Sequence, residues 1–251
     1  MLTWNSCRDC AIRSDALCGA MQAEELAQLN RVAHRKRFRP GSVIMGNGEP
    51  PDWCANIVSG VIKLTLTLAD GRQQIVGLLF PSDFLGRPYK DRSPYTAEAA
   101  TIVELCCFSR RHFEQILEEQ PAPRRLYIER TLDCVDAARD WMLLLGCKSA
   151  EERVATLILL IARRRRTSWL GAGPGSGLPP GQPPDAASQP LHFELPLSRT
   201  DMAEYLGLRI ETVSRQLRRL STAGIIATSS RRFVTVRDVA ALERIVERPR
   251  G

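Results

Sequence analysis

The chain has 251 residues, of which 44% are hydrophobic, so it is long enough for two folded domains that each bury a core. Lysine and arginine exceed aspartate and glutamate by 35 − 28 = 7, and this charge favours a polyanionic partner such as nucleic acid. No apolar segment reaches the roughly 18 residues of a membrane span, and no apolar signal core follows Met1. We therefore expect a cytoplasmic protein without a membrane partner.

Three of the eight cysteines, Cys7, Cys10 and Cys18, lie near the N-terminus with C-x2-C-x7-C spacing. Two thiolates separated by two residues can bind one metal centre, and a third can complete most of its coordination shell. In a reducing compartment, cysteines serve metal binding, redox chemistry or core packing more often than structural disulfides. Residues 1–20 have little apolar periodicity, so the sequence predicts a loop organised by whatever its cysteines bind.

A short helix is predicted over residues 21–32, and the pattern then changes to short apolar runs separated by glycines over residues 37–108. Within this region, residues 61–68 alternate between apolar and polar side chains, and Asp70-Gly71 separates them from a second apolar run. Asp-Gly between two such runs favours a β-hairpin. Several short strands at this spacing predict a β-barrel or roll.

A long helix is predicted over residues 125–145, where apolar residues recur at spacings of three and four. This spacing favours a coiled-coil seam, and an ordinary core helix is the alternative. Trp141 and Leu144 lie off the seam and can pack on the barrel. The predicted seam consists of Ile128, Thr131, Val135, Ala138, Met142 and Leu145.

A second helix is predicted over residues 150–166, and it ends in four consecutive arginines. Residues 171–190 are rich in glycine, proline, serine and alanine, and this composition cannot form a core. We interpret residues 171–190 as a flexible insert and assign it no function.

The C-terminal part of the chain predicts a helix-turn-helix. Ser198 to Asp201 fits a capping box, Gly207 permits a sharp turn, and a second helix follows over residues 210–221 with Gly224 at its end. Met202, Ala203 and Leu206 form the buried face of the first helix, and the second buries Ile210, Val213, Leu217 and Leu220. Two strands, at residues 225–228 and 233–236, then make a wing with Arg231 and Arg232 at its tip.

The outward face of the second helix carries side chains that can read DNA, although a solvated polar face is the alternative. Arginine can donate two hydrogen bonds to guanine, and glutamate can accept one from cytosine. Base contacts come from the N-terminal part of such a helix, so Arg218 and Arg219 are expected to contact phosphate. The predicted DNA-binding residues are Glu211, Ser214, Arg215 and Arg218.

The segment Leu206-Gly-Leu-Arg-Ile-Glu-Thr-Val-Ser-Arg-Gln-Leu217 resembles the recognition helix of the CRP/FNR superfamily, FNR-type branch; residues 57–63 and 150–155 also resemble family segments. The resemblance covers nearly the whole chain and implies an α+β fold: an N-terminal β-roll sensor domain, a long dimerisation helix and a C-terminal winged helix-turn-helix. The corresponding ranges are 1–20 for the cysteine loop, 21–121 for the roll, 122–147 for the helix and 148–251 for the DNA-binding domain. The implied half-site is TTGAT within an inverted repeat of double-stranded promoter DNA.

The resemblance also implies a sensory ligand. Family members that bind cyclic nucleotide place an arginine where this chain has Tyr95, so we expect no cyclic nucleotide. FNR-type members bind a [4Fe–4S] cluster through four cysteines, which here correspond to Cys7, Cys10, Cys18 and Cys106. Cys106 is preferred because it aligns best with the family's cysteine, and only one of Cys106 and Cys107 can face the cluster from a strand. The C-x2-C-x7-C spacing departs from the C-x2-C-x5-C of the best-known members, but it resembles the branch found in photosynthetic and nitrogen-fixing proteobacteria.

These features predict an oxygen-responsive regulator that is not an enzyme. Without oxygen, the cluster would order the N-terminal loop against the dimer helix and favour a homodimer that binds DNA and works with RNA polymerase. Asp140 matches an acidic position of the family's dimer helix, where like charges repel, and is included in the interface. The alternative is a family member with another input, namely nitric oxide, thiol redox or structural zinc. Cys54, Cys134 and Cys147 have no partner at metal-site spacing and are expected to serve as small hydrophobic side chains, with Cys54 buried in a strand and Cys134 and Cys147 on or beside the dimer helix.

Overall fold

The computed structural model describes residues 7, 10–170, 191–230 and 232–247, with the backbone alone for 165–170. The predicted insert at residues 171–190 and the wing residue Arg231 lie outside the described residues. The chain divides into two compact units, Met1–Ala138 and Arg139–Gly251, and the division falls within the long helix α3 (Pro121–Cys147). None of the described helices combines the length and the apolar character that crossing a bilayer requires.

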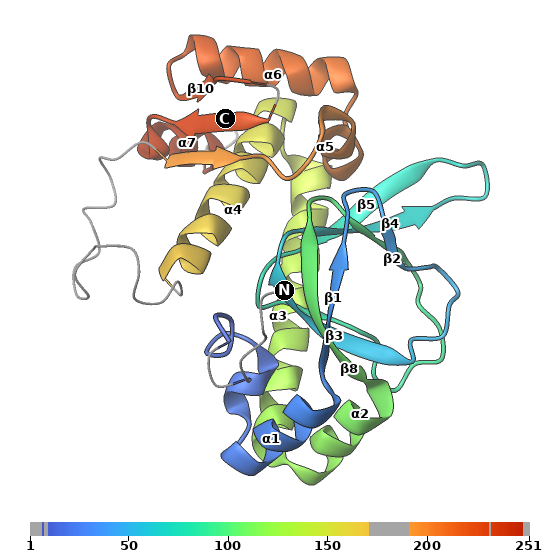
Figure 1. The fold of residues 1–251 in the computed structure, drawn as a ribbon. Coiled ribbons are helices and arrows are strands. Elements are labelled where there is room, and N and C mark those ends of the chain that lie inside the picture. The colour runs from blue at the N-terminus through green and yellow to red at the C-terminus, as the bar shows by residue number, and fades with distance from the viewer. Residues whose placement is uncertain (1–6, 8–9, 171–190, 231, 248–251) are drawn as a thin grey trace. The chain divides into compact units, whose positions relative to one another are not determined.

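The first unit is built around a β-roll, which confirms the fold predicted for this region (Figure 1). A short 3-10 helix (Leu17–Ala20) and α1 (Ala23–Val32) precede the roll, and α1 begins with a capping box between Gln22 and Glu25. Two four-stranded sheets follow, with strand orders β1-β8-β3-β6 and β2-β7-β4-β5. Their strands are β1 (His34–Phe38), β2 (Val43–Met45), β3 (Trp53–Ser59), β4 (Ile62–Thr67), β5 (Gln73–Leu79), β6 (Phe84–Leu85), β7 (Thr96–Ala99) and β8 (Val103–Ser109).

Two turns of the roll, at Gly60 and Gly71, contain a glycine with a positive φ. The Asp70-Gly71 hairpin joins β4 to β5 as predicted, and Gly71 adopts a positive φ of 86°. Gly60, between β3 and β4, has a φ of 89°, and a Cβ built there would lie 2.2 Å from the carbonyl oxygen of Ile102. Because only glycine accommodates both the dihedral and the close approach, the exit of β3 is restricted to glycine.

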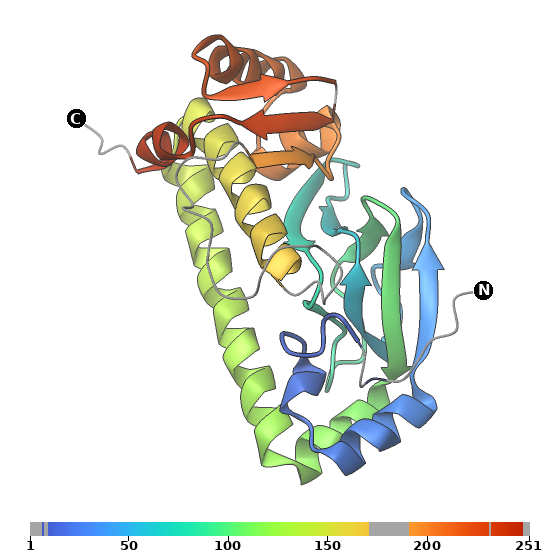
Figure 2. The same cartoon turned by 60° about the vertical axis from the view of Figure 1, so that its left-hand side comes forward.

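The sheet β1-β8-β3-β6 separates two apolar cores. Its inner face contributes Ala55, Ile57, Leu105 and Cys107 to the core inside the roll. Its outer face contributes Cys54 and Phe108 to a second core, which we call the outer core. The N-terminal segment, α1, α2 (Arg110–Glu119) and the first part of α3 complete the outer core. Figure 2 shows α1 (blue) and α2 (green) next to the start of α3. The aromatic members of the outer core are Phe84, Phe108, Phe113 and Tyr127, and Phe84 stacks on Phe113 at 4.9 Å.

The second unit is a winged helix-turn-helix with one strand more than the sequence predicted. It contains α4 (Ala150–Leu170), α5 (Arg199–Leu206), α6 (Ile210–Thr222) and α7 (Val239–Val246). Strand β9 (Leu191–Glu194) was not predicted; it pairs with β11 (Phe233–Val236), which in turn pairs with β10 (Ile226–Thr228). The strand is short and lies directly after the insert, so periodicity alone did not mark it.

The end of α3 belongs to the DNA-binding unit. Trp141 stacks on Tyr205 of α5 with ring centroids 3.8 Å apart, so the expectation that Trp141 packs on the barrel is wrong. Arg153 of α4 donates hydrogen bonds to the carbonyl oxygens of Leu145 (2.6 Å), Lys148 (2.9 Å) and Leu206 (3.1 Å). One half-buried guanidinium therefore connects α3, the α3–α4 turn and the helix-turn-helix.

We predict that Arg153→Met lowers the free energy of unfolding by about 2 kcal/mol or more, because three carbonyl groups lose a charged donor. Urea denaturation followed by tryptophan fluorescence measures the change. Arg163→Met is the matched control, since Arg163 makes one exposed ion pair with Glu243 and should cost less than about 1 kcal/mol. Equal losses in the two variants would contradict the role given to Arg153.

Candidate cysteine site and DNA-binding surface

The three N-terminal cysteines lie on the outer core of the roll. Cys7 and Cys18 are buried in this core, and the half-buried Cys10 packs against it. The segment is held by local backbone turns, in which Arg13 N–H donates to the Cys10 carbonyl at 3.0 Å. The Cys7 N–H donates to Asn30 Oδ1 of α1 at 3.2 Å. The predicted loop is therefore a compact segment whose cysteines face the protein interior.

The two candidates for the fourth cysteine ligand, Cys106 and Cys107, lie on strand β8 and face opposite sides of the sheet. Adjacent side chains of a strand point to opposite faces, and Cys107 lies in the core inside the roll. Cys106 is also buried, and it interacts electrostatically with Cys7, Cys10 and Cys18. The structure thus brings the four predicted cysteines together, with Cys107 on the opposite face of the sheet.

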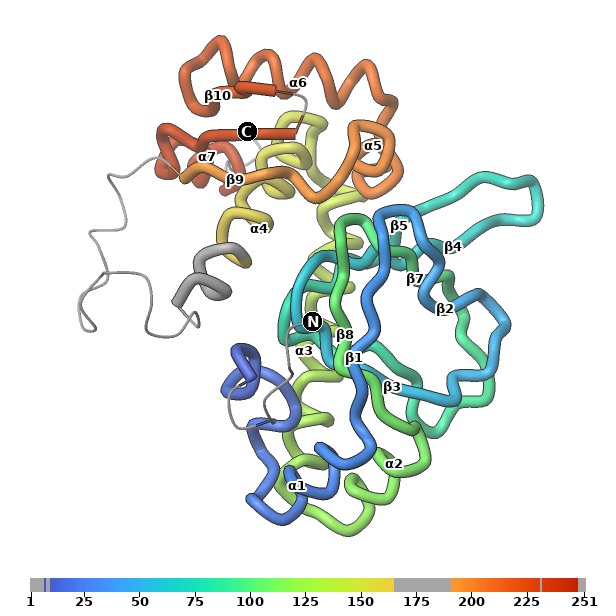
Figure 3. The backbone as a smooth tube through the Cα atoms, viewed as in Figure 1, coloured from blue at the N-terminus to red at the C-terminus, as the bar shows by residue number. Residues whose placement is uncertain are grey.

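Two polar side chains that the sequence analysis missed flank Cys106 on the neighbouring strands. In the sheet register, Arg35 of β1 and Asn56 of β3 are the partners of Cys106. Strand β1, which carries Arg35, lies beside β8 (Figure 3). Arg35 Nη2 lies 3.8 Å from Cys10 Sγ, and its Nη1 lies 3.3 Å from Glu104 Oε1. No sequence motif marks Arg35 or Asn56, because their position depends on long-range strand pairing.

Burial raises the pKa of three of these thiols, those of Cys7, Cys18 and Cys106. Burial raises the pKa of Cys106 to about 12; Arg35 opposes this rise and the three other cysteines add to it. Burial, with the neighbouring Cys10 and Cys7, raises the pKa of Cys18 to about 11, and burial likewise raises the pKa of Cys7. Thiolates at this site consequently require a bound cation to compensate their charge.

The donor set fits a soft metal centre. Thiolate ligands select zinc, copper(I) and iron–sulfur clusters, and Cys₄ is the donor set of a [4Fe–4S] cluster. Within the described part of the chain, no three histidine, cysteine or acidic side chains converge on a point that would hold a single metal ion. In an iron–sulfur cluster each thiolate binds a different iron, and the four cysteines supply the number and type of ligands that such a cluster requires.

The remaining cysteines differ in their environments. Cys54 is fully buried in the outer core, as expected, and burial raises its pKa to about 12. Cys134 and Cys147 lie on the long helix α3, as expected, and both are exposed in the single chain.

The helix-turn-helix has the predicted local geometry. Ser198 caps α5, with its Oγ accepting from Asp201 N–H at 3.1 Å, and Gly207 turns the chain with a φ of 60°. Val213, Leu217 and Leu220 of α6 are buried as predicted, and Gln216 is buried as well. Ile210 is 43% exposed, so its predicted inward position is wrong: it lies at the open N-terminus of α6, before the turn that contacts the core.

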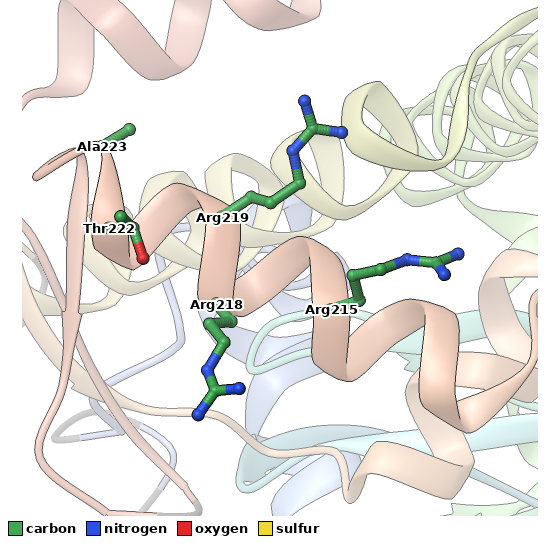
Figure 4. Close-up of a pocket in the computed structure, with 5 residues that line it drawn as sticks. All are labelled: Arg215, Arg218, Arg219, Thr222 and Ala223. Carbon is green, nitrogen blue, oxygen red and sulfur yellow. The ribbon is translucent and has the colours of Figure 1, made fainter.

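The opposite face of α6 carries exposed polar side chains. Glu211, Ser214, Arg215 and Arg218 are all exposed, as the prediction required. Arg215, Arg218 and Arg219 line an open hollow of about 430 Å³ together with Thr222 and Ala223 (Figure 4). Arg218 and Arg219 leave the helix on opposite sides in this view. At the wing, Arg232 is exposed.

Most of the predicted seam of α3 is exposed within the single chain. Ile128, Thr131, Val135, Ala138 and Met142 are exposed, and Met142 reaches 71%. Leu132 and Leu143, which the predicted seam omitted, are also exposed, and so is Asp140. Leu145 is half-buried within its own chain, where a methyl group lies near Gly207. An exposed apolar face of this length is typical of a helix that pairs with another helix.

Tyr95, the residue on which the expectation about cyclic nucleotides depends, packs against the core inside the roll. The Arg87 guanidinium lies 5.9 Å from the centre of its ring. Burial raises the pKa of the Tyr95 hydroxyl. The expectation that the roll binds no cyclic nucleotide stays a prediction.

Comparison with known proteins agrees with this architecture. The chain matches the cyclic nucleotide-binding domain family over residues 35–120 and the Crp-like helix-turn-helix domain family over residues 152–245. It is 42% identical to the transcriptional activator protein FnrL of Cereibacter sphaeroides, over 94% of this chain and 90% of that protein. It is 38% identical to the nitrogen fixation regulation protein FixK of Bradyrhizobium diazoefficiens, over 88% of this chain and 86% of that protein.

Solved structures show the same fold. The structure of FixK2 from Bradyrhizobium japonicum superposes with a TM-score of 0.73 at 30% identity, covering 87% of this chain and 100% of that chain. A CooA variant from Carboxydothermus hydrogenoformans shares the fold, with a TM-score of 0.65 at 18% identity over 88% of this chain and 90% of that chain. With a roll, a long helix and a winged helix-turn-helix in this order, and with relatives of such identity over most of its length, the chain belongs to the Crp/FNR family of DNA-binding regulators.

Proposed function

We propose that this protein is an oxygen-responsive transcriptional activator that binds a [4Fe–4S] cluster through Cys7, Cys10, Cys18 and Cys106. The observation that carries the proposal is the gathering of these four thiols on the outer face of the roll, in a chain that also presents a DNA-reading helix. The FnrL relative is named a transcriptional activator, which supports activation. When bound, the cluster supplies an oxygen-labile link between the N-terminal segment and the roll.

The N-terminal segment contacts the long helix directly. Arg130 Nη2 of α3 donates to the carbonyl oxygen of Asp15 at 3.1 Å, and Asp15 lies between Cys10 and Cys18. Leu126 and Tyr127, one turn earlier, pack against the outer core that contains Cys7 and Cys18. The conformation of the cysteine segment is therefore coupled to the first half of α3.

Dimerisation through α3 would connect the sensor to DNA affinity. Ile128, Val135 and Met142 expose an apolar face that a second copy would bury. Each half-site gives modest binding alone, and joining two reading helices in one dimer multiplies the affinity. Asp140 is exposed on the same helix, where a like charge from the partner would oppose association. With apolar contacts favouring the dimer and Asp140 opposing it, a few kcal/mol from an ordered N-terminal segment would shift the monomer–dimer equilibrium.

The exposed face of α6 accounts for sequence recognition in this proposal. Glu211, Ser214 and Arg215 lie near the N-terminal end of α6, where side chains reach base edges of a TTGAT half-site. Arg218 and Arg219 lie one turn further on and are placed for phosphate contacts. RNA polymerase is the expected partner of a promoter-bound activator.

Anaerobic reconstitution with iron and sulfide tests the proposal. We expect a brown protein with about four irons per chain that loses its colour and its DNA binding in air. Cys106→Ser should abolish the colour, and Cys107→Ala should retain it, because Cys107 faces the interior of the roll. A colourless protein that holds zinc, or one that binds DNA equally in air, would support the alternative inputs and contradict the proposal.

Arg130→Met should uncouple cluster binding from dimerisation. We expect unchanged iron content and a dimer dissociation constant about tenfold higher, equivalent to about 1.4 kcal/mol, because the segment loses its hydrogen bond to α3. Anaerobic analytical ultracentrifugation measures the constant. The control is Arg124→Met, which removes an exposed arginine of α3 that makes no side-chain hydrogen bond to the segment among the described residues. An unchanged constant in Arg130→Met would contradict the coupling.

Arg215→Ala and Arg218→Ala should weaken DNA binding in different ways. Losing Arg215 should cost about 1–3 kcal/mol and relax the preference at one base pair of the half-site, since it removes a base contact. Losing Arg218 should weaken binding to all sequences and reduce the salt slope by about one. Fluorescence anisotropy at several salt concentrations distinguishes them, with Arg244→Ala of α7 as the control. Identical behaviour of the two variants would contradict the assignment.

A further inference from the structure

Four side chains form one row across the outer face of the roll, one from each strand of the sheet. The register pairs Arg35 of β1 with Cys106 of β8, Cys106 with Asn56 of β3, and Asn56 with Phe84 of β6. Paired residues of neighbouring strands point to the same face. Cys106 is therefore flanked by an arginine on one side and an asparagine on the other, facing the N-terminal cysteines.

Asn56 is the unusual member of this row. The residue is 2% exposed, and its Oδ1 is buried without a hydrogen-bond partner in the described part of the chain. A buried amide group without a partner is costly, and native proteins rarely leave one unsatisfied. Its neighbours on the same face are Cys106 and Phe84, of which only the cysteine has a polar atom. The Asn56 carboxamide therefore indicates a polar group beside it, at the position that Cys106 also faces.

The guanidinium of Arg35 lies beside the sulfur of Cys10. Its Nη1 lies 3.3 Å from Glu104 Oε1, and its Nη2 lies 3.8 Å from Cys10 Sγ. The carboxylate on β8 orients the guanidinium, so that one side of the planar fork is directed toward the cysteines. Four thiolates carry a large negative charge, which a fixed arginine at their edge compensates.

We propose that Asn56 and Arg35 are positioning residues that donate N–H hydrogen bonds to sulfur atoms of the [4Fe–4S] centre and set its reduction potential. This inference rests on the proposed function. Hydrogen bonds to sulfur and nearby positive charge stabilise the more negative, reduced state and therefore raise the reduction potential. The carboxamide offers two donors on its nitrogen, and its nitrogen and oxygen can exchange places by rotation of the side chain.

The test compares Asn56→Leu and Arg35→Met with matched controls in the full-length protein after anaerobic reconstitution. Asn56→Leu keeps the side-chain shape and removes the donors, and Thr65→Val is its control at a buried polar position of the other sheet. Arg39→Met is the control for Arg35→Met, because it removes an exposed arginine just after β1. The readouts are iron and sulfide per chain and the one-electron midpoint potential, measured by dye-mediated titration with electron paramagnetic resonance.

We expect both variants to bind the cluster with a more negative midpoint potential than wild type, and both controls to keep the wild-type value. A tenfold weaker tendency to accept one electron corresponds to about 59 mV. Potentials equal to those of the controls would overturn the inference while leaving the cluster assignment intact. A wild-type protein that takes up no iron and sulfide would instead overturn the proposed function itself.

A second measurement separates this role from a structural one. Leucine in place of a buried carboxamide whose oxygen has no partner should leave the thermal stability of the metal-free protein unchanged or higher. Metal-free Asn56→Leu that unfolds at a clearly lower temperature than metal-free Thr65→Val would show that the carboxamide serves the fold, and it would overturn the inference.

Discussion

The alternation of side chains along β8 is the constraint on which the rest of the first unit depends. One strand contributes Leu105 and Cys107 to the core inside the roll, and Cys106 and Phe108 to the opposite face. Because both faces are buried, the register of this strand cannot slip without exchanging apolar and polar side chains on both sides. The N-terminal cysteines, the aromatic cluster and α3 are all assembled on the face that this register defines.

Burial then determines the chemistry of the site. Burial raises the pKa of the Cys7, Cys18 and Cys106 thiols, so these three cysteines resist ionisation until a bound cation compensates their charge. The N-terminal segment is also part of the outer core through Ile12 and Leu17, which bind no metal. A bound centre would therefore add to an existing packing arrangement, and its loss would remove only part of what holds the segment. This arrangement is suited to a graded response of α3 to the state of the cysteines.

Local sequence signals predicted much of this architecture. The Asp70-Gly71 hairpin, the long helix, the Ser198 capping box and the Gly207 turn depend on a few adjacent residues, and the structure confirms them. Features set by long-range pairing were not predictable in this way. The positions of Arg35 and Asn56 depend on which strands pair, and the contact of Trp141 depends on α5, more than sixty residues away in the sequence. Ile210 is exposed because it is the first residue of α6 and lies beyond the edge of the core. The spacing of apolar residues along a helix does not show where that edge is.

The turn at Gly60 has a consequence for the strand that carries Asn56. Its positive φ and its close approach to Ile102 allow β3 to end and turn at one point, and β3 carries Asn56 only four residues earlier. A residue without a side chain thus permits the end of β3 to lie close to the backbone that leads into β8. If the proposed ligands hold a cluster, more than the cysteines matters: related chains that keep every cysteine but alter this turn would retain the proposed ligands and change the strand that carries Asn56.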